Sequence, residues 1–409
     1  MVESKKLLND PTDIKQQFSI FSEFPELVYL DNAATTQRPQ SVINRVNNFH
    51  QRENASIRRG VYRLSARAAQ EFEAARSAVA KFFRAPQENC IAFTQGATES
   101  VNIVARSIIE ATLKPGDNVV VSLMEHHANL IPWQMLCQAN GAELRIIPVS
   151  ELGDLDLSEL DTLIDARTAI VAVVHISNTL GTINPVEKII AAAHQREVPV
   201  LVDAAQSAAL YPIDLTNLDC DFMVCSAHKM FGSFGVGILY VHPRYHRQVQ
   251  PYNYGGGIIR SVTVKETEFL SYPYLLEAGT PNVAGVIGLA EAIRFIETLD
   301  RTSLVKQLHQ LTNDARQKLA SVEGLSLLGN PALSSSLLSF SLDGMHPHDI
   351  ASFLNEDHIA VRAGQHCTQP LLDHLGVPAT VRVSLSIYNT PSDIDKLVGS
   401  MQAMKSFWT

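Results

Sequence analysis

The segments 198-VPVLVDAAQ-206 and 221-DFMVCSAHKMFG-232 decide the fold of this chain, because each is a short apolar run that ends in polar residues. Apolar residues, many of them β-branched, occupy successive positions of each run, which is typical of strands buried on both faces of a parallel sheet. Four further runs have the same character: 118-NVVVSL-123, 144-LRIIPV-149, 169-AIVAVVHIS-177 and 236-VGILYV-241. We therefore expect an α/β fold with a mostly parallel sheet.

Helical patterns such as 185-PVEKIIAAAHQRE-197 separate the strands, and past residue 300 the order of elements changes. That last part contains a long polar helix, strand 337-LLSFSL-342, helix 347-PHDIASFLNED-357, strand 359-IAVR-362 and a final helix from Pro391. A chain of 409 residues also exceeds the size at which one hydrophobic core keeps growing. We expect a large domain over residues 23-295 and a smaller α+β domain formed by residues 1-22 and 296-409.

The composition excludes several classes of protein. Hydrophobic residues make up 46% of the chain and the formal net charge is −9, with no long run of Lys or Arg. We expect no nucleic-acid partner, since such partners require clustered positive charge. The first residues lack an apolar signal segment and no uninterrupted apolar stretch is long enough to span a bilayer, so no membrane partner and a cytoplasmic location are expected.

The cysteines show no C-x-x-C pair, so we expect no metal site. Four of them lie in or beside apolar runs, where a buried cysteine is usually only a small hydrophobic residue: Cys90, Cys137, Cys220 and Cys225. Cys367 is the exception, because it lies between polar residues near Gly364.

Polar residues follow three of the predicted strands, at the sheet edge where ligands gather in open α/β folds. Asp203 ends one strand and Gln206 follows it; Lys229 comes directly after another; and His126 and His127 follow a third. A buried lysine can form a Schiff base when its pKa is lowered, and an imidazole can stack on a flat ring. A fourth segment, 96-GATE-99, turns into a helix whose N-terminal amides form a ready phosphate site.

Each of these features is ordinary by itself, because most such lysines face solvent and most such aspartates only cap or pair. Together they meet the needs of pyridoxal phosphate: a lysine for the aldehyde, an acid for the pyridine nitrogen, a planar group over the ring and donors for the phosphate. We therefore expect a pyridoxal phosphate enzyme.

The chain resembles the group II cysteine desulfurases of the SufS/CsdA kind, which are fold-type I pyridoxal phosphate enzymes of the class V aminotransferase family. The resemblance covers nearly the whole chain and is carried by 30-LDNAATTQRP-39, 96-GATE-99, 125-EHHANLIPWQ-134, 177-SNTLGT-182, 203-DAAQ-206, 226-SAHKMFG-232, 277-EAGTPN-282, 361-VRAGQHC-367 and 382-RVSLSIYNT-390. It implies a seven-stranded, mostly parallel sheet and, for the cofactor, Lys229 as the Schiff-base lysine. The other cofactor-binding residues that it implies are Asp203 at the pyridine nitrogen, His126 on the ring, Gln206 and Asn178 near the ring hydroxyl, and Thr98, Ser226 and His228 at the phosphate.

The resemblance also implies the reaction. Arg382 would bind the carboxylate of L-cysteine, with Arg362 and Asn178 nearby, and Cys367 would take the sulfur as a persulfide while alanine leaves. Thr280 would reach the phosphate of a partner subunit, which implies a homodimer. A sulfur-acceptor protein of the SufE or SufU kind would carry the sulfur to iron–sulfur cluster assembly, and L-selenocysteine is a second candidate substrate.

Two alternatives stay open on the sequence. One is another pyridoxal phosphate reaction on the same fold, such as that of an aminotransferase or a kynureninase-like hydrolase. The other is a non-catalytic scaffold that binds the cofactor and docks sulfur-transfer partners. The chain also departs from its relatives at Arg58, Ala97, Ala204, Ala227 and the pair Ser233-Phe234; Ala204 and Ala227 replace glycine and so raise a question about loop geometry.

Overall fold

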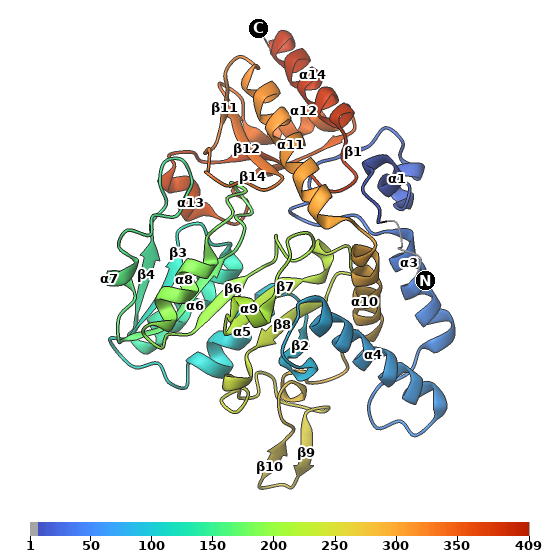
Figure 1. Ribbon diagram of the computed structural model, residues 1–409, viewed down its shortest axis with the longest axis vertical. Helices are drawn as coiled ribbons and strands as arrows, with labels where there is room; N and C mark the ends of the chain where they lie inside the picture. Colours follow the sequence, from blue (N-terminus) through green and yellow to red (C-terminus); the bar gives the residue numbers. More distant parts are fainter. Residues whose placement is uncertain (1–6, 409) are drawn as a thin grey trace, which may run out of the picture.

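All six apolar runs predicted as strands form strands, and a seventh strand joins them in one sheet (Figure 1). The strand order is β2-β8-β7-β6-β5-β3-β4, and β8 alone runs antiparallel to its neighbours. Their bounds are β2 Ile91–Thr94, β3 Asn118–Ser122, β4 Glu143–Ile147, β5 Thr168–Val174, β6 Val200–Asp203, β7 Phe222–Ser226 and β8 Gly237–Val241. The seven-stranded, mostly parallel sheet expected from the sequence is confirmed.

This computed structural model describes residues 7–408. The part of the predicted small domain that comprises residues 1–6 therefore lies outside the described residues. Within 7–408, no helix combines the length and the apolar character that crossing a membrane requires.

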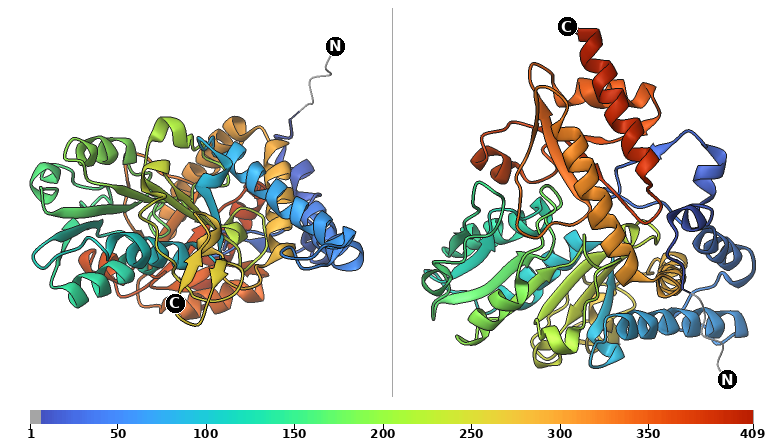
Figure 2. Two further views of the ribbon diagram at one scale, coloured as in Figure 1. Left: turned by 90° about the horizontal axis from the view of Figure 1, so that it is seen from below. Right: turned by 45° about the horizontal axis from the view of Figure 1, so that its top comes forward.

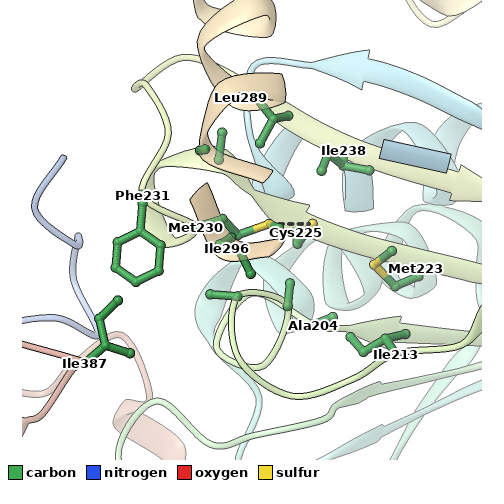
Figure 3. Packing of buried hydrophobic residues seen from close by; sticks show 14 of the residues in the cluster. Ala204, Ile213, Met223, Cys225, Met230, Phe231, Ile238, Leu289, Ile296 and Ile387 are labelled. Atoms are coloured by element: carbon green, nitrogen blue, oxygen red, sulfur yellow. Dashed lines mark hydrogen bonds between the residues drawn. The ribbon is translucent and has the colours of Figure 1, made fainter. Parts of the chain in front are cut away.

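Helices cover both faces of the large sheet, as expected for strands that are apolar on both sides. On one face, α5 (Ala97–Val104) and α6 (His127–Asn140) share a core with Val119 and Val121 of β3. The opposite face packs against α4 (Arg63–Phe82), α8 (Val186–His194) and α10 (Val283–Glu297). Figure 3 shows part of this second core, where the sulfur atoms of Cys225 and Met230 approach to 3.8 Å.

The smaller part of the chain contains a four-stranded antiparallel sheet in the order β11-β12-β15-β14. Its strands are β11 Leu325–Leu327, β12 Leu337–Leu342, β14 Arg362–Gly364 and β15 Thr380–Ser384. Its helices are α11 Arg301–Ala320, α12 Pro347–Glu356, α13 Gln369–His374 and α14 Pro391–Trp408. In the right-hand view of Figure 2, α11, coloured orange, runs from this part toward the large sheet.

The remaining elements lie at the margins of these two sheets. The shorter helices are α1 Pro11–Lys15, α2 Ser19–Glu23, α3 Gln40–Asn48, α7 Leu160–Leu163 and α9 Leu215–Leu218. A hairpin of β9 (Ile259–Val262) and β10 (Thr267–Phe269) projects from the side of the large sheet opposite the smaller part (Figure 1).

The single strand predicted at 359-IAVR-362 is wrong in its detail, because the chain changes sheets there. β13 (Ile359–Ala360) pairs in parallel with β1 (Val28–Tyr29), whereas β14 begins at Arg362 and pairs with β15. An apolar run cannot reveal such a change of partner, since both pairings need the same extended backbone.

The N-terminal segment packs against the smaller part. The ring centroids of Phe18 and Tyr388 are 4.8 Å apart, and Lys15 Nζ lies 3.7 Å from Asp393 Oδ1. The Phe18 ring also packs against Phe231 and Phe295 of the large part, with centroids 6.0 Å and 5.6 Å away, and the pairing of β1 with β13 extends the contacts with the smaller part beyond residue 22. The division at residues 23 and 296 stays a prediction.

Strand register places the predicted site residues at one edge of the large sheet. Val174 pairs with Asp203, and Gly237 pairs with both Thr94 and Ser226. The carboxyl ends of β2, β5, β6 and β7 therefore meet at the same edge, and the smaller part faces this edge.

Candidate active site

A cleft of about 620 Å³ lies between the carboxyl edge of the large sheet and the smaller part. All the predicted site residues except Thr280 line it. Such a volume is ordinary for a site that holds a cofactor or a drug-sized ligand. The cleft is therefore the candidate active site.

Lys229 and Asp203 supply the charges at the floor of the cleft. Asp203 is 3% exposed and its Oδ1 accepts a hydrogen bond of 2.9 Å from the amide of Ala205. Burial raises the pKa of Asp203, against the opposing effects of that amide and of Lys229. Burial lowers the pKa of Lys229 to about 8, so its amine gives up a proton more easily than an exposed lysine does.

His126 stays neutral at physiological pH. Its Nδ1 accepts a hydrogen bond of 3.0 Å from the amide of Ala128 at the start of α6, which leaves the proton on Nε2. Burial, followed by the charges of Lys229, His127 and Arg382, lowers its pKa to about 3. A neutral ring held by a helix terminus is suited to stacking on a flat ligand.

The start of α5 and the segment after β7 form one end of the cleft. Ser226 Oγ accepts a hydrogen bond of 2.9 Å from the amide of Ala97, and Thr98 is the next residue of the helix. The His228 ring stacks on Phe234 with centroids 5.3 Å apart. This end combines helix N–H groups, hydroxyls and an imidazole, which suits a phosphate group.

Arg382 and Asn178 form the opposite wall. Arg382 is 3% exposed, and its Nη1 donates to the carbonyl oxygen of Asn178 at 2.9 Å. The Asn178 side chain donates from Nδ2 to the carbonyl oxygen of His366 at 2.7 Å. Asn178 therefore connects the guanidinium with the turn that carries Cys367.

Cys367 lies at the tip of a strained turn. The amide of Thr368 donates to the carbonyl of Gln365 at 3.0 Å, and the two central residues have positive φ, 52° at His366 and 58° at Cys367. This arrangement corresponds to a type I′ turn, which normally selects Asn or Gly, and left-handed backbone costs another residue about 1–2 kcal/mol. The amide of His127 holds the tip through a hydrogen bond of 2.8 Å to the carbonyl of Cys367. Cys367 is exposed, unlike the other four cysteines.

The cleft residues fit pyridoxal phosphate. Among the described residues that line the cleft, four have a buried polar atom without a hydrogen-bond partner: Asn178 Oδ1, His228 Nδ1, His366 Nδ1 and Arg382 Nε. Buried polar atoms normally find partners, so each of these calls for a ligand. They lie beside an acid, a lysine and a neutral imidazole, which are the groups that this cofactor needs.

Residue-by-residue reasoning on the sequence gave no role to Asp31 and offered His127 only as the alternative to His126 for stacking on a ring. Asp31 binds both cleft arginines, and His127 holds the Cys367 turn. Asp31 does follow a short apolar strand, which is the signal that singled out Asp203, but β1 belongs to a different sheet. His127 holds the turn mainly through its backbone amide, for which a sequence carries no signal, and its Nε2 also accepts a long hydrogen bond of 3.4 Å from the amide of Gln369.

The departures from the relatives leave the backbone ordinary. Ala97, Ala204 and Ala227 are absent from the described residues with positive φ, so these positions do not require glycine here. Arg58 donates from Nη2 to Glu277 Oε2 at 2.9 Å and from Nη1 to its carbonyl at 2.7 Å.

Comparisons with known proteins agree with this geometry. The model of the family "Aminotransferase class-V" matches residues 28–397. A cysteine desulfurase of Pectobacterium atrosepticum is 42% identical over 377 residues, which cover 92% of each chain. Among solved structures, the cysteine desulfurase CsdA of Escherichia coli has a TM-score of 0.92 at 36% identity and covers 98% of this chain and 99% of its own. The apo cysteine desulfurase of Thermococcus onnurineus has a TM-score of 0.93 at 34% identity, with the same coverage.

The chain belongs to the class-V aminotransferase family, whose members on this fold use pyridoxal phosphate. Within that family it is a pyridoxal phosphate-dependent enzyme of the cysteine desulfurase group.

Proposed function

We propose that this chain transfers the sulfur of L-cysteine to Cys367, which becomes a persulfide, and releases L-alanine. The observation that carries this proposal is the position of Cys367: an exposed thiol on a strained turn in the wall of the cleft that contains Lys229. An aminotransferase or hydrolase reaction would not need such a thiol. A pure docking scaffold would have no use for a buried lysine of lowered pKa beside a buried aspartate.

The residues would hold the cofactor as follows. Lys229 binds its aldehyde, Asp203 the pyridine nitrogen, and His126 lies against the ring; Asn178 and Gln206 lie near the ring hydroxyl, and Thr98, Ser226 and His228 hold the phosphate. When bound, pyridoxal phosphate supplies an electron sink that stabilises negative charge at the substrate Cα. Thr280 is exposed and does not line the cleft of its own chain, which supports its assignment to a partner's cleft.

The protein's own groups perform the proton and sulfur transfers. Arg382 holds the substrate carboxylate, and the Lys229 amine takes the Cα proton, a step that its lowered pKa favours. The Cys367 thiolate attacks the substrate sulfur; an S–S bond forms as the C–S bond breaks, and the electron pair left on carbon is protonated to give alanine. Arg362 and Arg382 lie close enough to Cys367 to interact electrostatically with its thiolate.

The wider setting of the reaction is also part of the proposal. The chain acts as a homodimer in the cytoplasm and passes the persulfide sulfur to an acceptor protein of the SufE or SufU kind for iron–sulfur cluster assembly. The same attack would release selenium from L-selenocysteine. Exposed apolar side chains support a covered interface, among them Val61, Tyr62, Val262 and Val264.

Mass spectrometry of the purified holoenzyme after addition of L-cysteine tests the proposal, with alanine measured in parallel and Cys367→Ser as the matched control. A sulfur adduct on Cys367 with stoichiometric alanine, both absent in the variant, is the expected result. An intact cofactor spectrum with neither product would refute sulfur transfer. The molar mass in solution tests the dimer, and stimulation of turnover by candidate acceptors tests the partner.

A further inference from the structure

Asp31 binds both arginines of the cleft. Arg362 contacts it in a bidentate manner, with Nε 3.0 Å from Oδ1 and Nη2 2.8 Å from Oδ2. Arg382 reaches the same carboxylate from Nη2, 3.2 Å from Oδ1. One carboxylate therefore bridges the two cationic groups that were assigned to the substrate.

The two arginines differ in which of their guanidinium N–H groups already have a hydrogen-bond partner. Arg382 uses Nη1 for the carbonyl of Asn178 and one Nη2 hydrogen for Asp31, while its buried Nε has no partner among the described residues. The Nε edge of Arg382 therefore keeps one donor, the Nε–H, that no described residue uses and from which a ligand carboxylate can accept. In Arg362 the same Nε–H already has a partner, since its Nε and Nη2 both donate to Asp31.

Asp31 is itself fixed against the strand that carries Arg382. Its backbone forms a bridge with Ser384 in β15, and the amide of Ser384 donates to the carbonyl of Leu30 at 2.7 Å. The neighbouring Asn32 donates from Nδ2 to the carbonyl of Ser384 at 2.7 Å. The carboxylate therefore has a set position two residues along the strand from the guanidinium that it holds.

The charge of Asp31 also supports the cation. Burial lowers the pKa of Arg382 to about 10, and the nearby Asp31 carboxylate acts in the opposite direction. Arg382 thus remains protonated although its side chain is almost completely buried.

We propose that Asp31 is a positioning residue for substrate binding: it holds Arg382 with the Nε–H open to the substrate carboxylate and keeps Arg362 from competing for that anion. This inference rests on the proposed function, because it takes Arg382 as the carboxylate-binding group. It adds a division of roles in which Arg382 faces the carboxylate and Arg362 stays on the side of Cys367.

The test compares two ligands that differ in the carboxylate, L-alanine and L-alaninamide, on the holoenzyme. Their dissociation constants are measured from the change in cofactor absorbance, and the ratio of the two reports the carboxylate contribution. We expect Asp31→Asn to reduce this ratio about tenfold, which is the scale of one misplaced charged hydrogen bond. The affinity for L-alaninamide should stay within about twofold, and Asp31→Glu should recover part of the ratio.

Asp214→Asn is the matched control. Asp214 likewise pairs with an arginine, accepting from Arg84 Nη1 at 2.9 Å, but lies outside the cleft, so its substitution should leave the ratio unchanged. An unchanged ratio in Asp31→Asn, or an equal loss for both ligands, would overturn the role of Asp31. A wild type that does not prefer L-alanine would instead overturn the assignment of Arg382, and with it the inference that depends on it.

Discussion

His366 should make the folded protein sensitive to mild acid. Its ring is buried at 7% exposure, Nε2 lies 2.9 Å from Thr380 Oγ1, and Nδ1 has no partner among the described residues. Burial, followed by the charge of Arg382, lowers its pKa from 6.5 to about 3. Between pH 6.5 and about pH 3 the unfolded chain therefore binds a proton that the folded chain does not bind. The stability that neutral His366 contributes to the folded state is therefore fully present above pH 6.5 and is lost as the pH falls below that value.

The magnitude follows from the two pKa values. From pH 7.5 to pH 5.0, protonation of an unfolded histidine of ordinary pKa stabilises the unfolded state by about 2 kcal/mol, provided that the folded pKa lies below 5. Urea unfolding followed by circular dichroism at both pH values should show wild type losing about 2 kcal/mol more than His366→Asn. Asn is the matched replacement because it tolerates the left-handed backbone at this position.

The comparison cancels the contributions of the other histidines, since both proteins carry them. Equal losses for wild type and variant would show that His366 is already protonated in the folded state at pH 5, and would refute the reasoning.

Three further predictions concern the supports of the cleft. Glu277→Gln should destabilise the protein by about 3 kcal/mol, because the buried Arg76, now 2.7 Å from Glu277 Oε1, keeps only the half-exposed Glu73, at 2.9 Å, as a counter-charge; no measurable shift in urea unfolding would contradict this. Gly237→Ala should weaken cofactor retention on dialysis, because the new Cβ would lie 2.5 Å from Gly96 Cα at the start of α5. Retention equal to that of the wild type would show that the two strands move apart without weakening cofactor binding. His127→Ala should keep the backbone hydrogen bond that holds the Cys367 turn and lower persulfide yield less than twofold, whereas a large loss would mean that its ring takes part.

The strands and the candidate cofactor residues could be predicted because the sequence patterns that indicate them are local. Lys229 and Asp203 each follow an apolar run, and a parallel sheet brings such positions to one edge whatever the detailed register. β2 was not predicted, because it precedes the alternation of strands and helices from which the other strands were inferred, and its length, which equals that of β6, does not by itself distinguish a strand. Its place beside β8 is set by tertiary pairing and not by its own pattern.

The wall contributed by the smaller part was harder to predict. Asp31 becomes meaningful only when β1 pairs with β13 and sets its carboxylate against Arg382 and Arg362, more than three hundred residues away. The left-handed backbone at Cys367 is likewise imposed from outside, by hydrogen bonds from α6 and from Asn178. A sequence shows which groups exist there, but their orientation results from contacts between distant segments.

The change of sheets after Ala360 has a consequence for substrate length. Arg362 pairs directly with Arg382 across β14 and β15, and Cys367 follows on the turn just beyond β14. The proposed carboxylate anchor, Arg382, and the proposed sulfur acceptor, Cys367, thus lie on a paired strand and on the turn after its neighbour, and hydrogen bonds from His127 and Asn178 hold that turn against the large part. The fold therefore sets the distance between Arg382 and Cys367. L-homocysteine, which is one methylene longer than L-cysteine, would carry its sulfur past the thiol.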